Sequence, residues 1–357
     1  MRSKTIALGF ALFSASCGGS GQGPAEPVMP PASATPAPPP PPAAPVAAAP
    51  ASATAAASAA PAATPPNAED APATPEDYAD AEAKAKAEKA RFTPELREKA
   101  RALADAKPRS TRAGLEASLK SPHRKPGNPE RDVYRHPIET LEFIGITPKM
   151  TLLEYGPGEG WYTELLAPLL AKSGKLIVTT PDPNGPATDR NTLGAKRLDL
   201  FLDKSPELFG KVERVVVDGK NPSLPEENKL DAVLLFRGLH GMERAGTASA
   251  WLTAFHKALK PNGILGIVQH RAKTGDDPKA TAEKGYVPED WVIKTVEAAG
   301  FKLAGKSEVN ANPKDTKDYP EGVWTLPPTF RMKDKDHDKY AAIGESDRMT
   351  LKFVNKK

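Results

Sequence analysis

Residues 150–160 read Met-Thr-Leu-Leu-Glu-Tyr-Gly-Pro-Gly-Glu-Gly, and this stretch decides the fold class. The apolar run predicts a short buried strand ending at Glu154, after which Gly156, Gly158 and Gly160 stand at alternate positions. Glycine permits the backbone angles of a tight turn and lets a ligand lie against bare backbone. A helix predicted from Trp161 would present unpaired N–H groups to a carboxylate or phosphate. We therefore expect a nucleotide-bearing ligand at the carboxyl end of a parallel strand.

Strands and helices alternate after this turn, which predicts a parallel sheet with helices on both faces. Strands are expected at 151–155, 175–180, 212–217, 232–236, 264–269, 301–309 and 349–355. Helices are expected between them at 161–171, 196–202, 247–259 and 288–299, and ahead of them at 94–106, 112–119 and 136–144. The last strand has no crossover helix before it, so a terminal hairpin is expected.

The first fifth of the chain has the composition of an export signal and a linker. Arg2 and Lys4 precede the apolar stretch Ile6–Phe13, which is too short to span a bilayer. Ser-Ala-Ser-Cys at 14–17 is similar to the lipobox of bacterial lipoproteins, although Ser14 replaces the usual leucine. This similarity implies an exported protein anchored to the cell envelope by a lipid on Cys17; a plain secretory signal is the alternative.

Composition also sets the expected domains. Proline and alanine tracts such as Pro38–Pro42 and Ala55–Ala60 cannot bury enough apolar surface to fold, so they form a tether. We expect a lipoprotein-type signal peptide at 1–17, a disordered tether at 18–75, a helical segment at 76–125 and one α/β domain at 126–357.

Charge and cysteine content argue against several classes. The formal net charge of +4 is too small to indicate nucleic-acid binding. Cys17 is the only cysteine, so neither an intramolecular disulfide nor thiol catalysis is available. The six histidines show no paired spacing within one helix, so no metal site is expected.

The pattern acid-x-Gly-x-Gly-x-Gly resembles motif one of the class I S-adenosylmethionine (SAM) methyltransferases. A nicotinamide dehydrogenase is a weaker alternative, because its fingerprint needs glycine where Trp161 stands. From about Arg131 to Lys357 the chain resembles a bacterial group of predicted class I methyltransferases, on segments 135–141, 160–168, 285–290 and 312–320. The resemblance implies SAM as cofactor and a seven-stranded Rossmann-like sheet, mostly parallel, with an antiparallel last strand inserted between strands five and six.

The resemblance also implies cofactor-binding residues. Glu154 would lie near the methionine part of SAM, with the glycine turn wrapped around it. Thr180 stands where an acid usually meets the ribose hydroxyls, and Asp182 follows two residues late; Asp182 either reaches the ribose or only forms a turn. Asp218 stands where the family often bonds the adenine amino group, with a turn acid as the alternative. The candidates are Glu154, Gly156, Gly158, Gly160, Asp182 and Asp218.

Candidates for catalysis follow strands four and five. Arg237 and His240 come after strand four, and His270 and Arg271 end strand five, so all four are expected at one edge of the sheet. Either imidazole titrates near neutrality and could remove a proton. The long segment 310–331 is expected to be functional, since long structured loops in compact domains usually are. The resemblance implies that it forms a substrate wall.

Methyl transfer from SAM to a small-molecule acceptor is the leading hypothesis. Residues 236–239 read Phe-Arg-Gly-Leu in place of the Asn/Asp-Pro-Pro-aromatic motif of methyltransferases acting on nucleic-acid bases, which argues against that substrate class. An exported protein would meet little SAM, because SAM is made in the cytoplasm. The alternative is therefore an exported lipoprotein whose methyltransferase-like fold serves as a non-catalytic binding or scaffolding module. The oligomeric state is left open.

Overall fold

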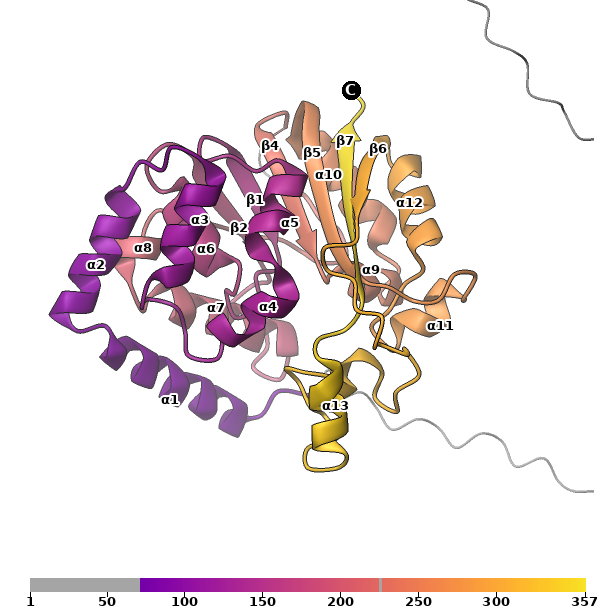
Figure 1. Ribbon diagram of the computed structural model, residues 1–357, viewed down its shortest axis with the longest axis horizontal. Helices are drawn as coiled ribbons and strands as arrows, with labels where there is room; N and C mark the ends of the chain where they lie inside the picture. The colour runs from indigo at the N-terminus through magenta and orange to yellow at the C-terminus, as the bar shows by residue number, and fades with distance from the viewer. Residues whose placement is uncertain (1–70, 225–226) are drawn as a thin grey trace, which may run out of the picture. The chain divides into compact units, whose positions relative to one another are not determined.

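The computed structural model describes residues 71–224 and 227–357. The expected signal peptide, Cys17 and the tether up to residue 70 lie outside the described residues. The described chain contains a seven-stranded sheet in the order β3-β2-β1-β4-β5-β7-β6 (Figure 1). Its strands are β1 (Thr151–Tyr155), β2 (Lys175–Thr180), β3 (Glu213–Val216), β4 (Leu230–Phe236), β5 (Leu259–His270), β6 (Phe301–Ser307) and β7 (Arg348–Asn355).

Strand directions confirm the predicted fold class. The strands β3, β2, β1, β4 and β5 pair in parallel. The last strand, β7, runs antiparallel to both of its neighbours, with Ile267 opposite Leu351 on the β5 side and Leu303 opposite Phe353 on the β6 side. The sheet is therefore Rossmann-like, mostly parallel, with its last strand inserted between β5 and β6 as expected.

Helices cover both faces of the sheet because successive strand residues point to opposite faces. Leu152 and Ala232 belong to one apolar cluster, whereas Leu153 and Val233 belong to the other. In Figure 1 the helices α3 and α5 lie in front of the sheet and α10 lies behind it. The helices are α1 (Pro75–Arg91), α2 (Pro94–Asp105), α3 (Thr111–Lys120), α4 (Asp132–Arg135), α5 (Pro137–Ile144), α6 (Thr163–Leu170), α7 (Arg190–Leu202), α8 (Pro206–Phe209), α9 (Leu239–Arg244), α10 (Ala248–Ala258), α11 (Pro278–Ala282), α12 (Glu289–Ala298) and α13 (His337–Ile343).

Two element boundaries differ from prediction for identifiable reasons. The helix expected at 196–202 begins at Arg190, because the Asp189 side chain caps it by accepting from the Asn191 N–H. Residues 260–263, which fall between the expected helix 247–259 and the expected strand 264–269, are part of β5, where Leu259 pairs with Leu230 and the register shifts before Ile264. Among the described residues, no helix combines the length and apolarity needed to cross a bilayer.

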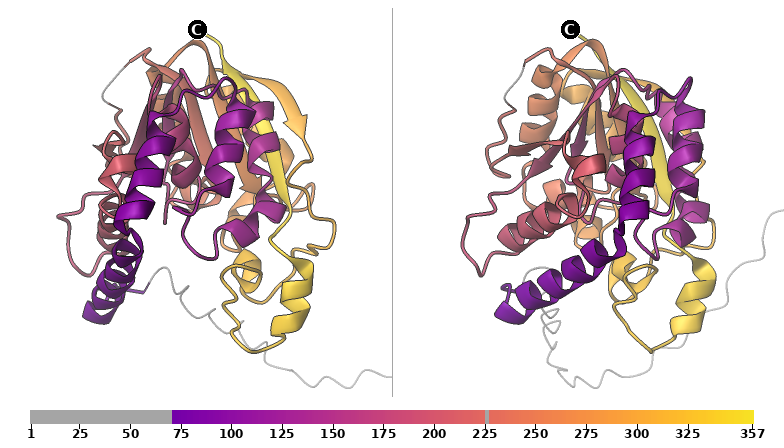
Figure 2. Two further views of the ribbon diagram at one scale, coloured as in Figure 1. Left: turned by 60° about the vertical axis from the view of Figure 1, so that its left-hand side comes forward. Right: turned by 90° about the vertical axis from the view of Figure 1, so that its left-hand side faces the viewer.

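The segment between β6 and β7 lies beyond the carboxyl ends of the parallel strands. It includes a 3-10 turn at Gly322–Thr325 and α13, both below the sheet in Figures 1 and 2. Tyr319, Leu326 and Tyr340 form a small apolar cluster of its own. The segment therefore has a packed structure and stands at the edge where open α/β sheets bind ligands.

Candidate functional site

The glycine turn after β1 has two different parts. Gly156, Gly158 and Gly160 all have left-handed backbone angles, with φ of 51°, 58° and 78°. A Cβ at Gly156 or Gly158 would meet no atom within 4 Å, whereas one at Gly160 would lie 2.3 Å from the ring of Phe201. The first two glycines therefore leave open space beside bare backbone, and the third is required by packing.

Glu154 is buried beneath this turn. Thr163, the first residue of α6, donates its hydroxyl hydrogen to Glu154 Oε2 at 2.7 Å. Burial raises the pKa of Glu154 to about 7, with the Thr163 hydrogen bond and the charge of Arg237 opposing the shift. This carboxyl group therefore joins the end of β1 to the start of α6.

A cavity of about 280 Å³ opens beside Gly156 at the carboxyl ends of β1, β4 and β5. It brings together three of the four residues expected at this edge and part of the segment 310–331. The lining residues are Gly156, Phe236, Arg237, His240, His270, Val323, Trp324, Pro327, Pro328, Thr329, Glu345 and Ser346.

Arg237 directly follows the carboxyl end of β4 and has a left-handed backbone conformation, with φ of 58°. Its backbone N–H donates to the carbonyl oxygen of Val268 at 2.6 Å, which fixes the turn. Its guanidinium group has no hydrogen bond or ion pair with any residue in 71–224 or 227–357. Burial lowers the pKa of Arg237.

Glu345 is a buried carboxylate that three arginines share. Its oxygens lie 2.8 Å from Arg131 Nε, 3.1 Å from Arg135 Nε and 2.7 Å from Arg348 Nη1. Arg135 also stacks over the ring of Trp161 at 4.6 Å. Sequence reasoning missed this group, because Arg135 and Glu345 are 210 residues apart and no spacing rule joins them.

His240 has a defined hydrogen-bond pattern. Gln269 is fully buried, and its Oε1 accepts from the Leu239 N–H at 3.1 Å. Its amide nitrogen, Nε2, lies 3.2 Å from both the Gly285 carbonyl oxygen and His240 Nδ1. An amide NH2 group can only donate, so His240 Nδ1 accepts and the proton of the neutral ring is on Nε2.

His270 lies 5.9 Å from His240, measured between ring centroids. Its Nδ1 is 2.5 Å from Ser346 Oγ, and a hydroxyl can either donate or accept. Burial lowers the pKa of His240 to about 4 and that of His270 well below its ordinary value. Both imidazoles are therefore neutral near pH 7.

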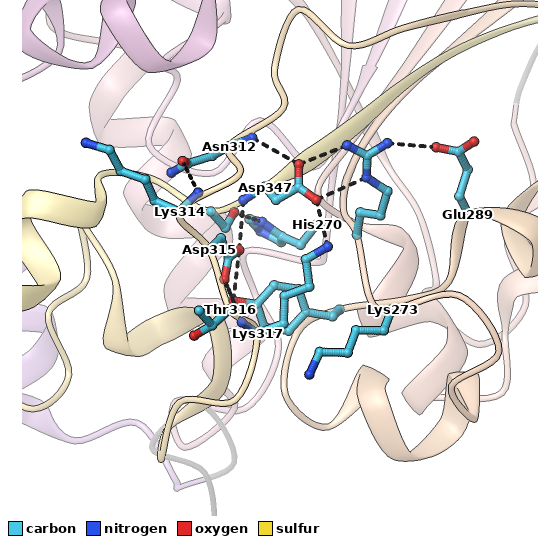
Figure 3. A network of polar contacts seen from close by, with 12 residues as sticks. His270, Lys273, Glu289, Asn312, Lys314, Asp315, Thr316, Lys317 and Asp347 are labelled. Atoms are coloured by element: carbon cyan, nitrogen blue, oxygen red, sulfur yellow. Dashed lines mark hydrogen bonds and ion pairs between the residues drawn. The ribbon is translucent and has the colours of Figure 1, made fainter.

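Arg271 does not join this cavity, contrary to expectation. Its guanidinium group is bound by Asp347 at 2.9 Å, Glu289 at 3.1 Å and Glu308 at 2.7 Å. Asp347 also accepts from Lys317 Nζ at 2.8 Å, and Figure 3 shows Asp347 and Glu289 within one network of polar contacts. Arg271 therefore ties β5 to the segment that precedes β7.

The two expected acids of the cofactor site are exposed and engaged in turns. Asp182 Oδ1 accepts from the Asn184 N–H at 2.8 Å, and Asp218 Oδ1 accepts from the Lys220 N–H at 2.9 Å. Thr180 is buried and donates to the Pro181 carbonyl oxygen. The turn-forming alternative thus describes both acids in this structure. Among the described residues, no group of three or more His, Cys, Asp or Glu side chains could hold a metal ion.

No protein-family model matches the chain, and no curated protein matches it. One similar solved structure is a SAM-dependent methyltransferase from Aquifex aeolicus, at 17% identity over 64% of this chain and 93% of that chain, with a TM-score of 0.42. A second is a putative sarcosine dimethylglycine methyltransferase from Galdieria sulphuraria, at 13% identity over 64% and 86%, with a TM-score of 0.42. A third is phosphoethanolamine N-methyltransferase 2 of Haemonchus contortus in complex with SAM, at 13% identity over 68% and 60%, with a TM-score of 0.41. At these identities and TM-scores the similarity carries no conclusion about activity.

Proposed function

We propose that this protein transfers a methyl group from SAM to a small-molecule acceptor. The observation that carries the proposal is the position of the open glycine turn, because Gly156 belongs both to that turn and to the wall of the cavity. SAM supplies a methyl group that its sulfonium already activates. The bare backbone at Gly156 and Gly158 would hold the cofactor, and the topology matches the motif-one resemblance of the sequence.

His270 is the better candidate for the base. If its Nδ1–H donates to Ser346 Oγ, Nε2 keeps a free lone pair inside the cavity. His240 has no free lone pair at Nε2, because its Nε2 carries the proton. His270 would then remove a proton from the acceptor while the cavity walls align it for attack.

Isothermal titration of the full chain with SAM tests the proposal. We expect saturable binding that Gly158→Val abolishes, because the new side chain fills the open space beside the turn. Gly275→Val is the matched control, since Gly275 also has a positive φ, at 83°, with no atom within 4 Å of its Cβ position. A folded wild-type protein, confirmed by circular dichroism, that shows no heat at millimolar SAM would contradict methyl transfer.

A non-catalytic binding module is the second candidate, and the end of β2 favours it. Thr180 replaces the acid expected there, and Asp182 bonds its own turn in solvent. Such a module would bind a ligand in the cavity without SAM. Saturable SAM binding in the same titration would remove this candidate.

We also propose that the protein is exported and anchored through a lipid on Cys17. The support is the sequence at residues 1–17, an apolar stretch followed by Ser-Ala-Ser-Cys. In bacteria expressing the full chain, Cys17→Ala is expected to lose labelling by a clickable palmitate analogue and to leave the membrane fraction. Labelling at the wild-type level in Cys17→Ala would show that the lipid is not on this cysteine.

A further inference from the structure

The cavity contains a positive charge that no described residue pairs with. Arg237 lines it, and the guanidinium has no hydrogen bond or ion pair with any residue the structure describes. Arg237 is half-buried, and charges drawn away from water are ordinarily paired, because an unpaired one loses hydration without compensation. An unpaired guanidinium at the cavity wall is therefore available to a ligand.

The groups that face Arg237 leave an excess of positive charge. The carboxyl groups of Glu345 and Glu154 attract its positive charge, and the guanidinium groups of Arg131 and Arg348 repel it. Glu345 is already shared by three arginines, and Glu154 is only partly ionised near pH 7 because burial raises its pKa to about 7. The neutral imidazoles add no negative charge.

His240 supplies a second free donor. Its Nδ1 accepts from Gln269, so its Nε2 carries a hydrogen, and this Nε2 has no hydrogen-bond partner among the described residues. The Gln269 side chain cannot be turned to exchange its oxygen and nitrogen, since both amide hydrogens and the carbonyl oxygen are hydrogen-bonded as they stand. His240 thus presents an N–H donor in the same cavity as Arg237.

We propose that the cavity binds the acceptor through an anionic oxygen group, a carboxylate or a phosphate, held by Arg237 and the His240 Nε2–H. The role of this ligand as methyl acceptor rests on the methyl transfer proposed above, whereas the preference for an anion rests on the cavity alone. A guanidinium group matches the fork of a carboxylate or phosphate. A cavity of about 280 Å³ suits a small molecule.

Three probes of similar size test the proposal on the full chain: benzoate, phenyl phosphate and benzyl alcohol. Ligand-observed NMR titrations are expected to show saturable binding of at least one anion, at least tenfold tighter than benzyl alcohol. The better anion identifies the carboxylate or the phosphate as the preferred group. The proposal would be overturned if neither anion bound saturably at concentrations up to ~10 mM. It would also be overturned if benzyl alcohol bound as tightly as the anions.

Arg237→Gln is the variant that decides the role of the guanidinium. It should weaken the bound anion at least tenfold while leaving benzyl alcohol unchanged. Arg214→Gln is the matched control, because it removes one positive charge from β3, where Arg214 pairs with Asp199 of α7 and does not line the cavity. Anion binding that is insensitive to Arg237→Gln, in a variant with a wild-type circular dichroism spectrum, would refute the assignment.

Two further readouts complete the test. The ¹³Cδ2 chemical shift of His240 reports its tautomer; a proton on Nδ1 would contradict the donor role. SAM titrations of the same samples separate the two proposals. Anion binding that depends on Arg237 without SAM binding would leave the anion site standing and remove methyl transfer, and SAM binding without anion binding would do the reverse.

Discussion

At the scale of single residues, Arg237 combines two features that oppose folding. It is a non-glycine residue at φ of 58°, and its guanidinium group is unpaired within the described chain. Residues that bind charged ligands are often maintained at a cost in stability, because the compensating charge arrives with the ligand. Arg348 is the opposite case, since it donates to Glu345 at 2.7 Å and to the Tyr134 carbonyl oxygen at 2.8 Å.

We therefore predict opposite stability changes for two matched variants. Arg237→Gln should raise the free energy of unfolding by on the order of 1 kcal/mol, because an uncompensated charge is removed. Arg348→Gln should lower it by about 3 kcal/mol, because Glu345 loses a buried partner. Urea unfolding followed by circular dichroism measures both. A loss of stability in Arg237→Gln would show that its guanidinium has a structural partner.

Glu154 gives a prediction with a defined pH dependence. Its pKa is about 7 in the folded protein against an ordinary value of 4.5, so the folded state holds the proton more tightly than the unfolded state. Stability from this group is therefore present at low pH and is lost as pH rises from about 4.5 through 7. Glu154→Gln should be more stable than wild type at pH 8, by on the order of 3 kcal/mol. The difference should vanish near pH 4.5; a constant difference across this range would refute the shift.

Sequence reasoning identified some residues of the cavity and missed others for a physical reason. The carboxyl ends of parallel strands meet at one edge, so Arg237, His240 and His270 could be placed together from the strand pattern alone. Arg271 was misplaced, because neighbouring residues of a strand point in opposite directions and the sequence does not show which one faces the cavity. Gln269 and Ser346 act through contacts with residues far along the chain, which no local pattern encodes.

At the scale of elements, the glycine turn and α7 are packed against each other through Gly160 and Phe201. Gly158→Ala and Gly160→Ala both force a side chain into a left-handed conformation, which costs about 1–2 kcal/mol. Only Gly160→Ala also places its Cβ 2.3 Å from the buried Phe201 ring.

Thermal unfolding should therefore show a larger loss of stability for Gly160→Ala, by a further ~1–3 kcal/mol from overpacking. Gly160→Ala combined with Phe201→Leu should recover part of that difference. Equal losses in the two single variants would mean that α7 moves away without cost.

The elements found by sequence and those missed differ in length and pattern. β1 and β2 were predicted at their observed bounds, because both are short apolar runs between polar or turn residues. The helices α8, α11 and α13 have four to seven residues, too few to show a helical period. These short helices depend on tertiary packing, which the sequence does not display locally.

At the scale of the whole molecule, buried histidines link stability to pH. His123 is fully buried, its Nε2 lies 2.9 Å from the Glu164 carbonyl oxygen, and burial lowers its pKa to about 4. Burial also lowers the pKa of His240 to about 4. The unfolded chain takes up these protons below pH 6.5 and the folded chain only near pH 4, so stability falls as pH falls between those values.

We predict that His123→Gln flattens this fall, because one proton-linked group is removed. The part assigned to His123 is on the order of 3 kcal/mol across the interval from pH 6.5 to 4. Urea unfolding at several pH values measures the slope for both proteins. An unchanged slope in His123→Gln would show that the pKa of this imidazole is not shifted between the folded and unfolded states.

The position of β7 has a consequence for the order in which the protein is made. Among the strands that the structure describes, β6 hydrogen-bonds only to β7, and β7 is also the outer neighbour of β5. A ribosome synthesises β7 after all the other strands, so a nascent chain holds an unpaired β6 and an open edge at β5 until that moment. The sheet can close only after synthesis has passed Asn355. A nascent chain at that stage is exposed to edge-to-edge pairing with other chains, because β5 and β6 both present unpaired backbone groups.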